Sequence, residues 1–115
     1  MVAFGDPAFL DDPEPLQALA RAYPRSHLVG CSTAGEILGT TLRDGSLAVA
    51  VARFDSVHLA TATAPVTSRE GSFQAGATIA RQLASPELQA VLLFSDGLDV
   101  NGSELVRGLN AVLDR

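Results

Sequence analysis

Five apolar residues follow one another at Ala90–Phe94 and stop abruptly at Ser95-Asp96-Gly97. A short, uninterrupted apolar run with a polar stop predicts a strand that is buried within a sheet. Amphipathic patterns typical of helices flank this run, one starting at Thr67 and the other near Asn101. A buried strand between two helices favours an α/β fold.

The start of the chain shows the same alternation of strand and helix patterns. A short apolar run, Val2–Phe4, precedes a helix for which Asp12 is the expected N-cap and Pro13 the first residue. Pro24 ends this helix, and His27–Cys31 then predicts a short buried strand. The apolar stripe of the helix comprises Leu16, Leu19, Ala20 and Tyr23.

A β-hairpin is predicted in the middle of the chain. Its strands are Ser46–Phe54 and Val57–Ala64, joined by Asp55-Ser56 and preceded by a turn at Arg43-Asp44-Gly45. Both faces of the first strand stay uncharged up to Arg53, which is typical of a central strand.

The second half adds a helix, the 90–94 strand and a last helix. Thr67 and Glu70 have the spacing of a capping box, and Ser85-Pro86 ends the helix that they start. The inward residues of the two helices are Phe73, Gly76, Ala77, Ala80, Leu83, Leu105, Leu109 and Val112. The resulting order, β-α-β-(turn)-β-β-α-β-α, predicts a mixed α/β sheet with a hairpin in the middle. We expect residues 1–115 to form one domain, truncated at its C-terminal end because the last helical pattern still continues at Arg115.

Composition excludes several classes of function. The 13 acidic residues face 8 basic ones, all arginine, which gives a net charge of −5. A chain without lysine has no Schiff-base or phosphate-loop lysine, and its negative charge argues against nucleic acid or an anionic membrane as partner. The single cysteine, Cys31, excludes an internal disulfide. No apolar run reaches the roughly 18 residues of a membrane span and no leader sequence is present, so we expect a cytoplasmic protein.

Two loops follow predicted strands and combine small residues with hydroxyls and carboxylates. In open α/β sheets, ligands bind beyond the carboxyl ends of strands. We therefore expect the loops Gly30–Glu36 and Ser95–Glu104 to meet at one rim of the sheet and to bind a ligand. The candidate ligand-binding residues are Cys31, Ser32, Thr33, Glu36, Ser95, Asp96, Asp99 and Asn101.

Other interpretations of these residues stay open. Thr33-x-x-Glu36 and Asn101-x-x-Glu104 both have capping-box spacing, so they could serve only to start helices. Cys31 or Ser32 could instead be the nucleophile of a hydrolase or transferase, with His27 or His58 as base. The same histidines could bind haem. The spacing argues against a calcium loop, because it would place Gly97 and Gly108 at ligand positions.

The sequence from Val29 to Ile37, VGCSTAGEI, and the later SDGLDVNGSEL at 95–105 resemble the two signatures of the amino-terminal FIST domain. Tyr23-Pro24 and Asp44-Gly45-Ser46-Leu47 fit the same pattern, so the resemblance covers nearly the whole chain. It implies an intracellular sensory domain, joined to signalling modules such as histidine kinases and followed by a companion C-terminal domain. Amino acids are the proposed ligands, and some members resemble haem-binding nitric-oxide sensors.

The leading hypothesis is therefore a non-catalytic sensory domain, without a cofactor, that binds a small polar metabolite such as an amino acid. The hydroxyls of Ser32 and Thr33 would hold the carboxylate, while Asp96, Asp99 or Glu36 would hold the ammonium group. The expected partners are the small ligand and a companion FIST domain or signalling module. An exposed apolar sheet edge could also support a homodimer.

Overall fold

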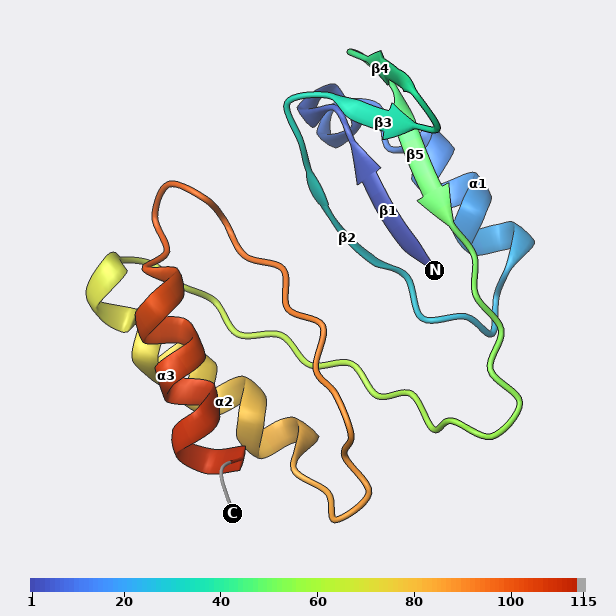
Figure 1. The fold of residues 1–115 in the computed structure, drawn as a ribbon. Coiled ribbons are helices and arrows are strands. Elements are labelled where there is room, and N and C mark those ends of the chain that lie inside the picture. Colours follow the sequence, from blue (N-terminus) through green and yellow to red (C-terminus); the bar gives the residue numbers. More distant parts are fainter. Residues whose placement is uncertain (114–115) are drawn as a thin grey trace. The chain divides into compact units, whose positions relative to one another are not determined.

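The computed structural model describes residues 1–113 and is drawn in Figure 1. The chain divides into two compact units, Met1–Leu59 and Ala60–Arg115, and each is described by itself. The first unit is a small sheet with helices, and the second is built around a pair of helices. The predicted mixed α/β class is confirmed.

A three-stranded mixed sheet organises the first unit. Its central strand is β1 (Val2–Gly5), which pairs in parallel with β2 (Val29–Ser32) and antiparallel with β5 (Leu47–Ala50). The strand order is therefore β2-β1-β5. The strand predicted at 27–31 corresponds to β2, which begins two residues later and ends one residue later. The strand predicted at Ser46–Phe54 corresponds to β5, which already ends at Ala50.

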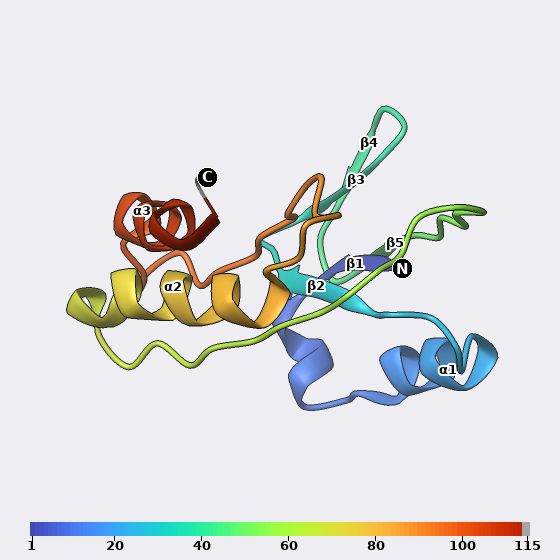
Figure 2. The same ribbon diagram turned by 90° about the horizontal axis from the view of Figure 1, so that it is seen from below.

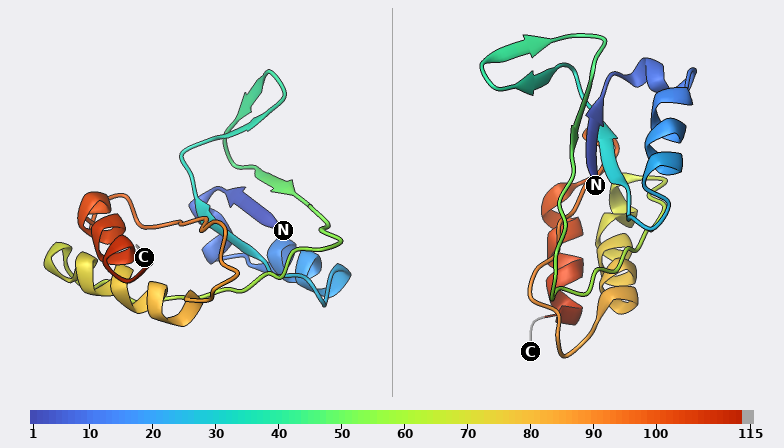
Figure 3. Two further views of the ribbon diagram at one scale, coloured as in Figure 1. Left: turned by 60° about the horizontal axis from the view of Figure 1, so that its bottom comes forward. Right: turned by 90° about the vertical axis from the view of Figure 1, so that its right-hand side faces the viewer.

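One face of this sheet carries the short 3-10 helix η1 (Pro7–Leu10) and helix α1 (Glu14–Ala22), as Figures 2 and 3 show. The predicted first helix is confirmed, but its N-cap is Pro13 and not Asp12. The Asp12 carboxylate still accepts a long hydrogen bond, 3.4 Å, from the amide of Glu14. The helix starts one residue late because η1 occupies the chain up to Leu10 and its cap is Asp11.

The hairpin in the middle of the chain lies earlier than predicted. Strands β3 (Glu36–Leu38) and β4 (Thr41–Arg43) pair antiparallel around a two-residue turn that begins with Gly39, whose φ is +64°. A positive φ at the first turn residue suits the right-handed twist of a two-residue hairpin, and glycine adopts it without strain. The prediction of a hairpin at 46–64 was therefore wrong in position.

Two segments predicted as strands, 57–64 and 90–94, lie outside the assigned strands. Figure 1 draws both as stretched segments without strand arrows. Alternate side chains from these segments pack against the helix core of the second unit: Ala62, Ala64, Val91 and Leu93. The alternating pattern thus reflects packing on helices, because burial every second residue does not itself specify a neighbouring strand.

The second unit consists of a 3-10 turn, η2 (Arg69–Gly71), and two helices, α2 (Ser72–Leu83) and α3 (Gly102–Leu113). Its core contains Ile79, Ala80 and Leu109. The two predicted helices are confirmed, but the first begins with the 3-10 turn and Ser68 is its cap, not Thr67. The Glu70 carboxylate accepts hydrogen bonds from its own amide and from the Ser68 hydroxyl, which replaces the predicted pair with Thr67 and lowers the pKa of Glu70.

Helices α2 and α3 pack closely along their length, as the right-hand view of Figure 3 shows. Gly76 of α2 lies against the backbone of α3, and Gly108 of α3 lies against the backbone of α2. Small residues at such positions let helix backbones approach, which explains why the predicted inward residues of the first helix include Gly76, Ala77 and Ala80. Of the helices in residues 1–113, none has the length and apolar character that crossing a membrane requires.

Candidate functional site

A pocket of about 240 Å³ lies in the first unit, between the sheet and the helical layer of η1 and α1. Two of the predicted ligand-binding residues, Cys31 and Ser32, line it. Its walls come from η1, α1 and all three strands of the sheet: Ala3, Gly5, Asp6, Pro7, Phe9, Leu10, Leu16, Leu28, Val29, Gly30, Cys31, Ser32 and Leu47. The first of the two predicted loops therefore does border a cavity.

Gly30, the first glycine of the first signature, has a packing role beside this pocket. Gly30 pairs with Ala3 across β1 and β2, and a Cβ built on Gly30 would lie 1.9 Å from the carbonyl oxygen of Ala3. Only glycine allows the two strands to come so close. The close approach brings Cys31, which is half-buried, opposite Phe4 at the sheet end of the pocket.

Of the carboxylates in the described part of the chain, Asp6 is the one that lines the pocket, and it follows β1 directly. Its Oδ1 accepts a hydrogen bond of 2.8 Å from the amide of Ala8, which makes Asp6 the N-cap of η1. Its Oδ2 accepts a longer bond, 3.3 Å, from the amide of Gly45. Asp6 is thus fixed in place by two backbone donors while its side chain remains half-buried at the pocket wall.

Glu36 lies outside the pocket lining and is 5% exposed. Its carboxylate accepts hydrogen bonds of 2.5 Å from the hydroxyls of Ser46 and Thr33. These two bonds, with that of Ser46 the stronger influence, lower the pKa of Glu36, while burial of the carboxylate and, to a smaller extent, the negative charge of Asp6 oppose the shift. The Thr33–Glu36 pair therefore forms, but it holds the start of β3 and not the start of a helix.

The second predicted loop is also held by its own side chains. Asp96 Oδ1 accepts hydrogen bonds from the amides of Leu98 (2.7 Å) and Asp99 (2.8 Å), which lowers the pKa of Asp96. Ser95 and Asp99 are exposed. In this loop Asp96 organises a turn, as aspartate commonly does through local bonds to backbone amides.

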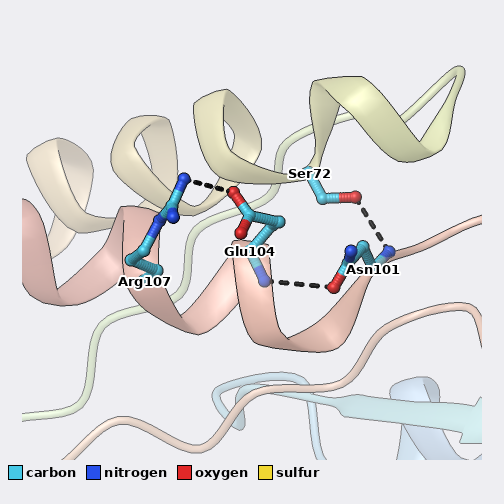
Figure 4. Close-up of polar contacts among 4 residues, drawn as sticks. All are labelled: Ser72, Asn101, Glu104 and Arg107. Carbon is cyan, nitrogen blue, oxygen red and sulfur yellow. Dashed lines mark hydrogen bonds and ion pairs between the residues drawn. The ribbon is translucent and has the colours of Figure 1, made fainter.

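Asn101 caps α3, as the capping interpretation predicted. Its Oδ1 accepts a hydrogen bond of 3.2 Å from the amide of Glu104, and Glu104 in turn forms an ion pair of 2.6 Å with Arg107 (Figure 4). The amide of Asn101 donates to the hydroxyl of Ser72, which is fully buried at the start of α2. Asn101 therefore connects the beginnings of both helices.

The two predicted loops belong to different units. Cys31, Ser32, Thr33 and Glu36 lie in the first, and Ser95, Asp96, Asp99 and Asn101 lie in the second. Their meeting at one rim stays a prediction. Within the first unit, the structure brings Cys31 and Ser32 to the pocket and leaves Thr33 and Glu36 bonded to each other.

The sequence analysis missed Asp6, although the signal was present. Asp6 follows the first apolar run in the same way that the two chosen loops follow theirs. The helix η1 behind it was not predicted either, and it supplies the pocket wall that Phe9 forms. In residues 1–113, no group of three His, Cys, Asp or Glu side chains is placed to hold a metal ion.

A wider depression of about 440 Å³ lies in the second unit. It is bordered by segment 88–93 and by one face of α3, through Leu88, Gln89, Ala90, Val91, Leu93, Val106, Leu109, Asn110 and Leu113. Among residues 1–113, none of the predicted ligand-binding residues and no charged side chain lines it. The pocket of the first unit is therefore the better candidate site.

Comparison with known proteins gives one informative result. The family model of the FIST N domain matches residues 1–115, the whole chain. The comparison with curated proteins gave no match, and neither did the comparison with solved structures. The two signatures at 29–37 and 95–105, on which the resemblance rested, are thus supported by a match that includes them both. The chain belongs to the FIST N domain family, a family of sensory domains of signal transduction.

Proposed function

We propose that this domain senses a small metabolite that carries an amino group, with an amino acid as the first candidate, and that it binds this ligand in the pocket of the first unit. The observation that carries the proposal is the position of Cys31 and Ser32, from the first family signature, in the wall of that pocket. The domain acts by binding and not by catalysis. Binding of the ligand in the pocket changes the activity of a signalling module or companion domain in the cytoplasm.

The size of the pocket supports a small ligand. A dry cavity of about 150 Å³ in another protein holds benzene, so about 240 Å³ accommodates a molecule the size of a small amino acid. Larger cofactors need more space, since pockets for drug-sized ligands span roughly 300–1,000 Å³. Haem binding through His27 or His58 therefore receives no support from this pocket, which neither histidine lines.

The polar groups support an amino acid as follows. The Asp6 carboxylate can accept from an ammonium group, and the exposed Ser32 hydroxyl can donate to a carboxylate. Thr33, in contrast, already donates its hydroxyl to Glu36 and its amide to the carbonyl of Gly5. In the proposal Asp6 therefore takes the ammonium-binding role that the sequence analysis gave to Glu36, and Ser32 acts without Thr33.

Calorimetric titration of the chain with each of the twenty amino acids tests the proposal. We expect at least one small apolar amino acid to bind, and we expect the Ser32→Tyr variant, which places a bulky ring at the pocket wall, to abolish its binding. Ser26→Tyr is the matched control, because Ser26 is exposed and outside the pocket lining. Absence of heat with all twenty at a few millimolar, or equal binding by the two variants, would refute the proposal.

A further inference from the structure

Building on the proposed function, we infer that the pocket of the first unit selects a small primary amine with a compact apolar body, and that a ligand carboxylate weakens binding there. The inference rests on the apolar wall, on the single carboxylate within it, and on the bonds already made by the neighbouring donors.

The wall is apolar apart from three residues. Asp6, Cys31 and Ser32 carry the polar side chains of the lining, and the remaining ten residues are glycine, alanine, proline, phenylalanine, leucine or valine. Such a surface favours a ligand whose body is hydrocarbon, because burying polar groups without partners is costly. The apolar part of the ligand would lie against Phe9 and Leu16, which come from η1 and α1.

The charge of the lining is negative. Asp6 lines the pocket, and no arginine or histidine within residues 1–113 does. A carboxylate has about four acceptor positions, and two backbone amides, those of Ala8 and Gly45, take one on each oxygen of Asp6. An ammonium group, which has three donors and no acceptor, can use the acceptor positions that remain.

A second negative charge lies near the first. The carboxylate of Asp6 acts electrostatically on that of Glu36, and the chain segment at Ser46 contacts both, since its carbonyl accepts from the amide of Asp6 and its hydroxyl donates to Glu36. Two neighbouring carboxylates repel an anionic ligand group and attract a cation.

The donors that could offset this repulsion are largely occupied. The amide and the hydroxyl of Thr33 donate to Gly5 and Glu36, so of the two hydroxyls in the signature it is that of Ser32 that lines the pocket. One hydroxyl provides far less than the paired donors of an arginine, which is the usual partner of a bound carboxylate. The amino acid should thus bind through its ammonium group and side chain, against the repulsion of its carboxylate.

Three ligands with one hydrocarbon body separate these contributions. 3-Methylbutylamine has the ammonium group alone, leucine has both charges, and 4-methylpentanoate has the carboxylate alone. We expect calorimetry or ligand-observed NMR on the 115-residue chain to give the amine an affinity at least about tenfold above that of leucine, with no binding of the acid. Asp6→Asn should weaken binding of the amine by about tenfold, because asparagine keeps the N-cap of η1 and removes the charge. Asp11→Asn is the matched control, since Asp11 is exposed and outside the lining.

The possible outcomes test the inference and the proposed function separately. Tighter binding of the amine, lost in Asp6→Asn and kept in Asp11→Asn, supports the inference. Binding of leucine above that of the amine, or equal binding in the two variants, overturns the inference and leaves the proposed function standing. Absence of binding by all three ligands overturns the inference, and when the other amino acids fail as well it refutes the proposed function.

Discussion

Gly76 and Gly108 lie on opposite helices, and each lies against the backbone of the other's helix. A Cβ at Gly76 would be 2.0 Å from the carbonyl oxygen of Leu105, and a Cβ at Gly108 would be 1.9 Å from that of Phe73. Neither helix can carry a larger residue at this crossing without moving away from its partner. The α2–α3 pair therefore depends on two glycines that are 32 positions apart in the sequence.

We predict that Gly108→Ala destabilises the chain, although alanine favours helix more than glycine does. The added methyl group clashes with the backbone of α2, and overpacking of this kind costs about 1–3 kcal/mol. The control is Gly102→Ala in the first turn of α3, where a Cβ meets nothing within 4 Å. Its effect should be neutral or stabilising by up to about 1 kcal/mol. Urea unfolding measures both, and a Gly108→Ala variant as stable as Gly102→Ala would contradict the close packing.

The link between Ser72 and Asn101 gives a second prediction. Ser72→Ala removes the buried hydroxyl that accepts the amide of Asn101, at 2.9 Å, and leaves this donor without its partner. We expect a loss of about 1–2 kcal/mol in the free energy of unfolding. Ser103→Ala, at an exposed position of α3, should change it by less than about 0.5 kcal/mol. Equal stability of the two variants in thermal or urea unfolding would show that the bond to Ser72 contributes nothing.

The pH dependence of Glu36 gives a third prediction. Hydrogen bonds from Ser46 and Thr33 lower its pKa in the folded chain below the usual value of 4.5. The unfolded state therefore binds the proton more readily, so the stabilisation is complete above about pH 4.5 and is lost as the pH falls through the lower, folded-state pKa. We expect the wild type to exceed Glu36→Gln in stability at about pH 6, and the difference to shrink towards about pH 3.

Urea unfolding at a series of pH values measures this difference. Glu14→Gln serves as control, because the Glu14 carboxylate is 65% exposed and its ion pair with Arg21 lies on the surface. Such pairs contribute little, so this variant should follow the wild type over the same range. A constant gap between wild type and Glu36→Gln at all pH values would contradict the interpretation.

Cys31 provides a fourth prediction, which separates the sensory proposal from the nucleophile hypothesis. The thiol is half-buried in the pocket wall, so iodoacetamide should label it more slowly in the folded chain than in the chain unfolded by urea. A ligand in the pocket should slow the labelling further. Labelling of the folded chain that is faster than that of the unfolded chain would instead favour Cys31 as an activated nucleophile.

The helices were the most predictable part of the fold. In α2 and α3 the apolar residues recur at helical spacing because one face of each helix is buried against the other, and inward residues such as Ala80 and Leu109 are indeed buried. The N-cap of α3 was predictable for a similar reason, since Asn101 bonds to an amide only three residues away. A cap of this kind can be predicted because it depends on residues that are close together in the sequence.

Strand pairing was less predictable because it depends on distant parts of the chain. In segment 57–64, Ala62 and Ala64 pack on the helix core while Val57 and Leu59 are exposed, and the run of strand-compatible residues reveals neither. Strands β3 and β4 were missed for the opposite reason, because Ile37 and Leu42 pair across the hairpin and remain 71% and 67% exposed. No burial pattern marks such strands, and only the glycine of the turn does.

The candidate site was predictable in part. The signature Gly30–Glu36 pointed to the pocket, but the sequence could not show that Thr33 and Glu36 use their polar groups on each other. Asp6 has a local signal, since it follows the first apolar run, but its place beside Cys31 and Ser32 depends on the pairing of β1 with β2, which no local pattern reveals.

The position of β1 at the centre of its sheet has a consequence for synthesis on the ribosome. Strand β1 emerges before both of its partners, so one of its edges stays uncovered until β2 is made and the other until β5 is made. Until Ala50 has left the exit tunnel, Val2–Gly5 therefore keeps at least the edge that pairs with β5 uncovered. Chaperone binding to the emerging chain should therefore be strongest during this interval.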